Sequence, residues 1–177
     1  MSILLVILYT LGAIILLFLL LALFIRNDFK LEKQVMIKKS QQDVFNYCKL
    51  LKNQEYYSVW VMKDPNIQIV YTGIDGTVGA CSSWTSNDKN VGIGAQEIIK
   101  LDEGNSMQVE IRFEKPFKAT NYATNTLISI GNGETKLNHV FTGHSKFPMN
   151  LMNLFMDKLV GKDMQQNLEN MKAILEK

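Results

Sequence analysis

MQVEIRFE, residues 107–114, decides the fold, because apolar and polar side chains alternate along it without interruption. The apolar members share one face, and they are Met107, Val109, Ile111 and Phe113. A period of two is typical of a β-strand with one face buried and the other in water. Such one-sided burial is common in antiparallel sheets. The stretch therefore predicts a half-buried antiparallel strand.

The segments on both sides repeat this alternation and are separated by turn sequences. The further predicted strands cover residues 28–37, 67–71, 80–86, 91–101, 119–130 and 135–141. Polar or glycine-rich stretches at 87–90, 103–105 and 131–133 predict the turns between neighbouring strands. Gly92 and Gly94 predict a bulge or a sharp bend in their strand. The chain thus predicts about seven antiparallel strands.

Helical patterns flank the strands. Ser40 is a good N-cap, and Asp43 three residues later gives an acidic variant of the capping box. The helix that follows carries an apolar stripe along residues 44–51. Residues 53–60 predict a short helix or turn, and residues 149–176 predict one long C-terminal helix. This order indicates an α+β protein whose curved antiparallel sheet wraps around the final helix.

The chain begins with an uncharged run, ILLVILYTLGAIILLFLLLALFI, at residues 3–25. A helix of this length is about 34 Å long, which is enough to cross a hydrocarbon core of about 30 Å. A cleaved signal has a basic start, a shorter apolar stretch and a small-residue cleavage site, and none of these is present. We expect a transmembrane anchor at residues 1–27, followed by one domain at residues 28–177.

The orientation of the anchor follows from its basic flank. No Lys or Arg precedes the run, and five basic residues follow it closely: Arg26, Lys30, Lys33, Lys38 and Lys39. Cytoplasmic flanks carry the excess of Lys and Arg in membrane proteins. The pattern predicts a single-pass membrane protein with its large domain in the cytoplasm.

The composition excludes several functions. The formal net charge is +2 with both signs interspersed, which is not the footprint of a nucleic-acid-binding protein. The chain has no zinc-protease, redox, phosphate-loop or nucleophile-elbow motif, and no full dinucleotide fingerprint. Its two histidines and two cysteines are dispersed, which argues against a metal site. We expect no cofactor, no metal and no nucleic-acid partner.

Residues 73–84, GIDGTVGACSSW, resemble the G-x-x-G-x-V-G-A-x-x-x-W motif of the SRPBCC superfamily. This superfamily comprises START-like and Bet v 1-like proteins and includes polyketide cyclase/dehydrase-type members. Further matches are Trp60 with Asp64-Pro65, Gly92 with Gly94, the Lys115-Pro116 step, Gly133 with Thr135, and residues 161–172. The resemblance covers residues 28–177.

The resemblance implies the helix-grip fold, with a deep cavity between the sheet and the C-terminal helix that usually holds an apolar ligand. The superfamily includes lipid carriers, hormone receptors, cyclases and co-chaperones, and it shares no catalytic constellation. We therefore transfer no catalytic residue to this chain. Family members often carry Trp at the position of His139, so this residue is a departure from their pattern.

The candidates for the cavity wall are aromatic side chains, methionines and one histidine. They are Tyr57, Trp60, Trp84, Phe113, Phe117, His139, Met152, Phe155 and Met156. Methionine is common at adaptable apolar binding surfaces, although ordinary core packing explains each of these residues equally well. His139 shares a strand face with Leu137 and Phe141, so it points inward if they do. His144 lies on the opposite face and is expected at the surface.

Three functions are compatible with the sequence. The first is a membrane-anchored binding module for a lipid or another hydrophobic small molecule. The second is a cyclase- or dehydratase-like enzyme, for which His139 and Glu97 are the only candidates for an inward acid–base pair. Glu97 shares its alternation with Leu101, but a bulge near Gly94 would turn it outward. The third is a non-catalytic interaction module with a solid core and a protein partner. The sequence leaves catalysis undecided and favours the first function.

Overall fold

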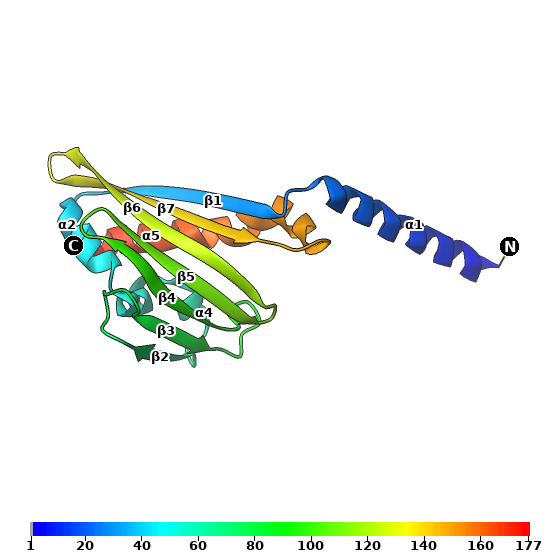
Figure 1. The fold of residues 1–177 in the computed structure, drawn as a ribbon, viewed down its shortest axis with the longest axis horizontal. Coiled ribbons are helices and arrows are strands. Elements are labelled where there is room, and N and C mark those ends of the chain that lie inside the picture. The colour runs from blue at the N-terminus through cyan, green and yellow to red at the C-terminus, as the bar shows by residue number, and fades with distance from the viewer. Residues whose placement is uncertain (1) are drawn as a thin grey trace.

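The computed structural model describes residues 2–177 and contains one seven-stranded antiparallel sheet. The strands are β1 (Asp28–Ile37), β2 (Gln68–Thr72), β3 (Cys81–Thr85), β4 (Ile93–Asp102), β5 (Ser106–Lys115), β6 (Ala119–Gly131) and β7 (Glu134–His144). They lie in the order β1-β7-β6-β5-β4-β3-β2. The predicted helix-grip architecture is confirmed, because this curved sheet wraps around the C-terminal helix (Figure 1).

Irregularities in strand pairing accompany the curvature of the sheet. The register between β4 and β5 shifts at Ile93/Gly94 and at Ile98/Lys100, and that between β6 and β7 shifts after Ser129. Such bulges bend a strand and increase its local twist. The predicted bend at Gly94 is thus confirmed, and the β4 side chains change face along the strand.

The short helices close one end of the sheet. They are α2 (Gln41–Cys48), the 3₁₀ turn η1 (Leu51–Asn53), α3 (Gln54–Tyr57) and α4 (Val59–Lys63). As predicted, Ser40 caps α2, since its hydroxyl oxygen accepts the Asp43 backbone N–H at 3.2 Å. The Ser40 hydroxyl also donates to the Asp43 carboxylate at 2.6 Å. Both contacts fix the start of α2 against the sheet end.

The C-terminal segment is not the single α-helix that its apolar periodicity predicts. It consists of a 3₁₀ helix η2 (Met149–Phe155), a π-helical turn η3 (Asp157–Gly161) and the α-helix α5 (Lys162–Leu175). A 3₁₀ helix repeats every three residues, so Asn150 and Asn153 lie on the same side of η2. Both side chains bind backbone carbonyls far away in the sequence, and this tertiary demand overrides the α-helical pattern.

The core fills only part of the space between α5 and the concave face of the sheet. One cluster of buried residues joins α2 and α5 to β1, β6 and β7, with Phe45, Leu137 and Met171 among its members. A second cluster lies farther along the sheet and includes Leu31, Ile98 and Met164. The first cluster seals the sheet at the α2 end, and members of both clusters border an internal hollow.

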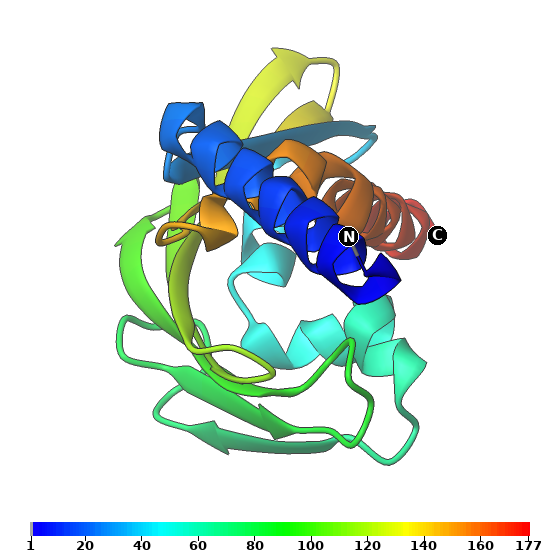
Figure 2. The same ribbon diagram turned by 90° about the vertical axis from the view of Figure 1, so that its right-hand side faces the viewer.

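The apolar run forms helix α1 (Ile3–Phe24), which projects from the other end of the domain (Figures 1 and 2). It has 22 residues and is long and apolar enough to cross a membrane. Its side chains are exposed except for that of Ala22, so α1 is not a core helix of this domain. By length and composition, α1 could be a membrane span or a signal sequence.

Two asparagines of η2 join α1 to the domain. The buried Asn150 amide donates to the carbonyls of Ala22 and Ile25, both at 2.8 Å. The Asn153 amide donates to the carbonyls of Arg26 and Asn27, both at 3.0 Å. The last carbonyls of a helix lack partners within it, so these amides satisfy the end of α1. The connection between α1 and the domain is therefore a packed joint.

A first prediction concerns Gly94, which pairs with Trp84 on one neighbouring strand and with Phe113 on the other. A Cβ atom at this position would lie 2.6 Å from the Arg112 carbonyl oxygen and 2.6 Å from the Trp84 ring. We expect Gly94→Ala to destabilise the domain by about 2 kcal/mol, or roughly 4–8 °C in Tm, because the ring must move. Tryptophan fluorescence during thermal unfolding measures this change.

The matched control is Gly12→Ala in α1, where an added Cβ meets no atom within 4 Å. This variant should leave the unfolding of the domain unchanged. Equal Tm values for Gly94→Ala and Gly12→Ala would show that the contact between Gly94 and Trp84 is unimportant.

Candidate functional site

The candidate site is a cavity of about 400 Å³ between the concave face of the sheet, the short helices and the C-terminal segment. Its walls combine inward side chains of β2 to β7 with side chains of α3, α4, η3 and α5. The four apolar residues of β5 that share one face, Met107, Val109, Ile111 and Phe113, all lie on the wall. The alternation that predicts the sheet therefore also builds an apolar wall of the cavity.

Six of the nine candidate residues lie on the cavity wall. They are Tyr57, Trp60, Trp84, Phe113, His139 and Met156. They come from α3, α4, β3, β5, β7 and the residue between η2 and η3, so the fold brings together parts of the chain that are far apart in the sequence, from Tyr57 to Met156. Burial of Tyr57 raises the pKa of its hydroxyl well above the ordinary value, so this group stays protonated.

The other three candidates lie outside the cavity, and for them the expectation is wrong. Phe117 is 70% exposed at the turn between β5 and β6, where the alternation of β5 has ended. Met152 is 44% exposed and Phe155 is 53% exposed, because η2 is a 3₁₀ helix and both residues lie on its outer side. Prediction of an α-helix assigned these two side chains to the wrong face.

An aromatic pair forms one wall of the cavity. The rings of Trp84 and Phe113 meet edge to face, with centroids 5.9 Å apart. Gly94 of β4 pairs with Trp84 of β3 on one side and with Phe113 of β5 on the other. Because Gly94 has no side chain, the Trp84 ring can occupy the space beside it. The Trp84 indole N–H donates to the Val91 carbonyl at 3.3 Å. Gly92 and Gly94 thus serve sheet geometry, as predicted, and not phosphate binding.

His139 is the principal polar group of the cavity. It lies directly opposite Asn125 in the β6–β7 ladder, and its Nδ1 is 2.6 Å from the Asn125 Oδ1. A side-chain carbonyl accepts hydrogen bonds, so the fitting tautomer carries its proton on Nδ1 and leaves Nε2 as an acceptor. Desolvation by burial lowers the pKa of His139 to about 4. At neutral pH the ring is therefore uncharged.

Further polar side chains line the same cavity, and they were not among the residues predicted from the sequence. Asn121 and Asn125 are inward residues of β6, and Gln96 is an inward residue of β4. The amides of Gln96 and Gln54 pair reciprocally, with N···O distances of 2.7 and 3.2 Å. The signal was available, because Asn121 and Asn125 alternate in phase with Ala123 and Leu127. Amides on the apolar face of a strand indicate a polar lining.

Glu97 does not form the inward acid–base pair with His139 that the enzyme alternative requires. It lies on the outer face of the sheet, where its carboxylate accepts from Arg112 at 2.9 Å. The same arginine also bonds Glu110 at 2.6 Å. The bulges of β4 place Gln96 on the cavity wall instead. His144 is at the surface, as predicted, with its Nδ1 2.8 Å from the Asp28 carboxylate.

Nucleophiles and metal ligands are sparse near the cavity. Burial raises the pKa of Cys48 to about 12, and its Sγ lies 3.3 Å from the Met171 sulfur, so the thiol is an inert core group. Tyr71 has a raised pKa because of desolvation and of its hydrogen bond to Glu55. Within residues 2–177, no group of three His, Cys, Asp or Glu side chains is arranged to hold a metal ion.

The fold is shared with solved structures of low sequence identity. Norcoclaurine synthase from Thalictrum flavum, in complex with dopamine and hydroxybenzaldehyde, matches with a TM-score of 0.65 and 11% identity, over 83% of this chain and 86% of that chain. Ara h 8.0201 matches with a TM-score of 0.61 and 15% identity, over 84% and 97%. The di-domain ARO/CYC StfQ from the steffimycin biosynthetic pathway matches with a TM-score of 0.62 and 12% identity, over 84% and 51%.

No family model matches this chain, and no curated protein matches it by sequence. Identities this low show the fold alone, which is the Bet v 1-like helix-grip fold. This fold is the one that the sequence resemblance implies.

A second prediction follows from the neutral state of His139. Its pKa is about 4 in the folded chain and near 6.5 in the unfolded chain, so below pH 6.5 only the unfolded state gains this proton. The free energy of unfolding should therefore fall between pH 6.5 and pH 4, by up to about 3 kcal/mol from this group. Above pH 6.5 the contribution is constant. Urea unfolding of the full chain in detergent, followed by tryptophan fluorescence, measures the slope.

His139→Gln should reduce this pH dependence, because its amide does not titrate and can still donate to Asn125. The surface variant His144→Gln is the control and should retain the dependence of the unaltered chain. If both variants show the same slope as the unaltered chain, His139 is not the buried titrating group.

Proposed function

We propose that this helix-grip protein is a membrane-anchored binding module that holds a lipid or another hydrophobic small molecule in its internal cavity. The observation that carries the proposal is the hollow of about 400 Å³ between the sheet and the C-terminal segment. Ligand sites commonly measure about 300–1,000 Å³ and combine apolar walls with a few placed polar groups. The cavity has this size and this composition.

The proposed ligand has a polar group that meets His139. The neutral ring offers Nε2 as an acceptor, and the amide of Asn125 beside it and that of Asn121 elsewhere on the cavity wall add donor and acceptor groups. A hydroxyl group satisfies this combination better than a charged group, because burial already keeps His139 uncharged. The apolar body of the ligand would then contact Trp84, Phe113 and the inward face of β5.

The anchor is proposed to be retained, with the domain on the cytoplasmic side. The alternative is a signal sequence, and the joint between α1 and η2 argues against it. Asn150 is fully buried, and its amide N–H groups are satisfied by carbonyls of α1. Removal of α1 would leave these buried groups without partners, at a cost of about 1–3 kcal/mol. The basic residues that follow α1 support the cytoplasmic side.

The two alternatives are less well supported. A scaffold with a solid core requires filled space where the cavity lies. The fold itself supports enzymes, since norcoclaurine synthase holds dopamine and hydroxybenzaldehyde in its complex. In this chain, however, Glu97 faces away from the cavity, and the side-chain hydrogen bond of His139 goes to the amide of Asn125 rather than to a carboxylate. A ligand contact is the role that this arrangement favours for His139.

A third prediction tests occupancy of the cavity. Native mass spectrometry of the full chain, released gently from detergent, should show the protein with an added small-molecule mass. Ala123→Phe places a large ring on the inward face of β6 and should abolish the added mass. Thr120→Phe places the same ring on the exposed face of the same strand and should leave it unchanged. Circular dichroism establishes that both variants fold.

Detection of the unliganded mass alone, in the unaltered chain and in Thr120→Phe, would contradict the proposed function. Retention of the added mass in a folded Ala123→Phe variant would place the bound molecule outside this cavity.

A fourth prediction concerns the polar group of the ligand. His139→Ala removes the Nε2 acceptor but keeps the apolar walls, so it should weaken binding or change which molecules co-purify. The loss should be largest for molecules that carry a hydroxyl group. Extraction followed by lipid mass spectrometry compares the bound set with that of His144→Ala. An unchanged bound set would show that His139 has only a structural role.

A further inference from the structure

The outer side of η2 carries a row of exposed apolar side chains. Residues three apart overlie one another in a 3₁₀ helix, so Met149, Met152 and Phe155 form one ridge. All three are about half exposed, and the neighbouring Leu154 is 64% exposed. Contiguous exposed apolar surface of this kind marks an interaction site. The ridge belongs to the segment that was expected to line the cavity, so its exposure has a different explanation.

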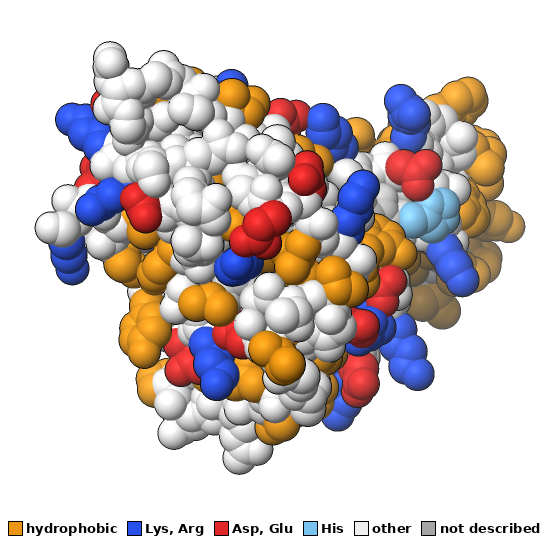
Figure 3. Space-filling model, turned by 60° about the vertical axis from the view of Figure 1, so that its left-hand side comes forward, with side chains coloured by type: hydrophobic (Ala, Val, Ile, Leu, Met, Phe, Trp, Pro, Cys, Tyr) orange, Lys and Arg blue, Asp and Glu red, His pale blue; other side chains and the backbone are white. Residues whose placement is uncertain are grey.

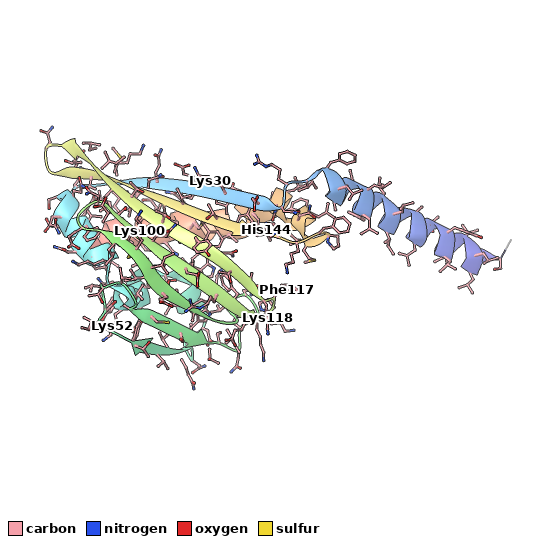
Figure 4. All side chains as sticks on the ribbon, viewed as in Figure 1. Lys30, Lys52, Lys100, Phe117, Lys118 and His144 are labelled. Carbon is pink, nitrogen blue, oxygen red and sulfur yellow. The ribbon has the colours of Figure 1, made fainter. Side chains whose placement is uncertain are left out.

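A second apolar projection lies at the same end of the domain. The turn between β5 and β6 ends in Phe117, and Figure 4 places Phe117 and Lys118 at the end of the sheet from which α1 leaves. Figure 2 views the molecule from this end, with the orange residues around η2 beside the base of α1. The ridge and Phe117 therefore lie at the end of the domain from which α1 leaves.

The joint fixes this direction relative to α1. Asn150 and Asn153 hold the end of α1 from the side of η2, and Met152 and Phe155 occupy other sides of the same 3₁₀ helix. The Ser145 hydroxyl donates to the Asn153 side-chain oxygen at 2.7 Å, which holds the start of the segment in place. Only residues 25–27 connect α1 to β1, and η2 packs against them. A membrane that contains α1 would therefore meet the domain at η2.

Basic side chains accompany the apolar ones at this end. Arg26 follows α1, Lys118 follows Phe117, and Lys146 precedes η2, and all three are exposed. Figure 3 shows Lys and Arg side chains beside the apolar surface of α1. Apolar side chains next to Lys and Arg are typical of protein surfaces that lie in the headgroup region of a bilayer. This charge pattern favours a lipid surface over an apolar protein partner.

We propose that η2 and the tip of the β5–β6 turn insert their apolar side chains into the membrane that α1 crosses, at the boundary between headgroups and acyl chains. This inference rests on the proposed membrane anchor. It assigns Met149, Met152, Leu154, Phe155 and Phe117 to a membrane-contact surface, referred to below as the foot. The occupant of the foot is the bilayer itself, not a second copy of the chain or another protein.

The foot also connects the bilayer to the proposed ligand site. Met156 follows η2 directly and lines the cavity, as does Val160 of η3. One short segment therefore has lipid on one side and the cavity on the other. A hydrophobic molecule dissolved in the bilayer would meet this segment first, and the irregular 3₁₀ and π geometry is less regularly hydrogen-bonded than an α-helix. The foot thus places the cavity wall within reach of membrane-dissolved ligands.

The test uses the full chain in vesicles of phosphatidylcholine and phosphatidylserine. Cys81→Ser removes the half-exposed thiol, and the buried Cys48 remains. Single cysteines at Met152, Leu154 or Phe117 then carry an environment-sensitive fluorophore. The matched control is Ile130→Cys, at an exposed apolar residue near the end of β6. The hairpin that joins β6 to β7 lies at the opposite end of the domain from α1 (Figure 1). Circular dichroism establishes that each labelled chain is folded.

Lipids that carry a nitroxide near the headgroup should quench the fluorophore several-fold more strongly at the three foot positions than at position 130. Aqueous iodide should show the reverse order. The inference would be overturned if each quencher acted equally at all four positions. It would also be overturned if the foot labels were shielded from both quenchers, because that result indicates that a protein partner covers the foot.

Alkaline carbonate extraction separates this failure from failure of the anchor. If the protein stays in the vesicles while the foot labels behave like Ile130, only the foot is wrong. If carbonate releases the protein, the proposed anchor is wrong, and the inference falls with it.

Discussion

The structure depends on the packing of α5 against only one end of a strongly curved sheet. Leu168 and Met171 of α5 meet Phe45 of α2 and Leu137 of β7, and these side chains exclude water from that end. Burial of such residues contributes about 1.5–3 kcal/mol for each side chain, which holds the sheet and the helix together. Toward the other end, Ala123 and Ser82 are too small to fill the space between the layers, and the cavity remains.

The same constraint accounts for the irregular C-terminal segment. A regular α-helix from residue 149 onward would continue the packing of α5, but η2 must also satisfy the end of α1. Asn150 and Asn153 meet this demand by lying on one side of a 3₁₀ helix, and the π-helical turn at Asp157–Gly161 joins it to α5. Lys33 pairs with Asp157 at 2.7 Å across this turn, which ties it to β1. The joint to α1 and one wall of the cavity are therefore built from the same segment of the chain.

The sequence predicted the sheet well because its strands alternate strictly and its turns carry glycine or asparagine. It predicted Trp84, Phe113 and His139 on the cavity wall because they follow that alternation. Glu97 stayed undecided, since a bulge changes the face of a strand without any sign in composition. The errors at Met152 and Phe155 have another cause: the partner of Asn150 lies 128 residues earlier in the chain, and periodicity contains no information about such contacts.

The central claim is that the unfilled end of the sheet is a ligand site, and an experimental structure of the full chain purified without delipidation tests it most directly. The account predicts elongated density between Trp84 and Phe113 on one side and Met156 on the other. A polar atom of the bound molecule should lie within hydrogen-bond distance of the His139 Nε2. A collapsed interior, with Trp60 or Phe113 filling the hollow and His139 bonded only to protein, would contradict the account.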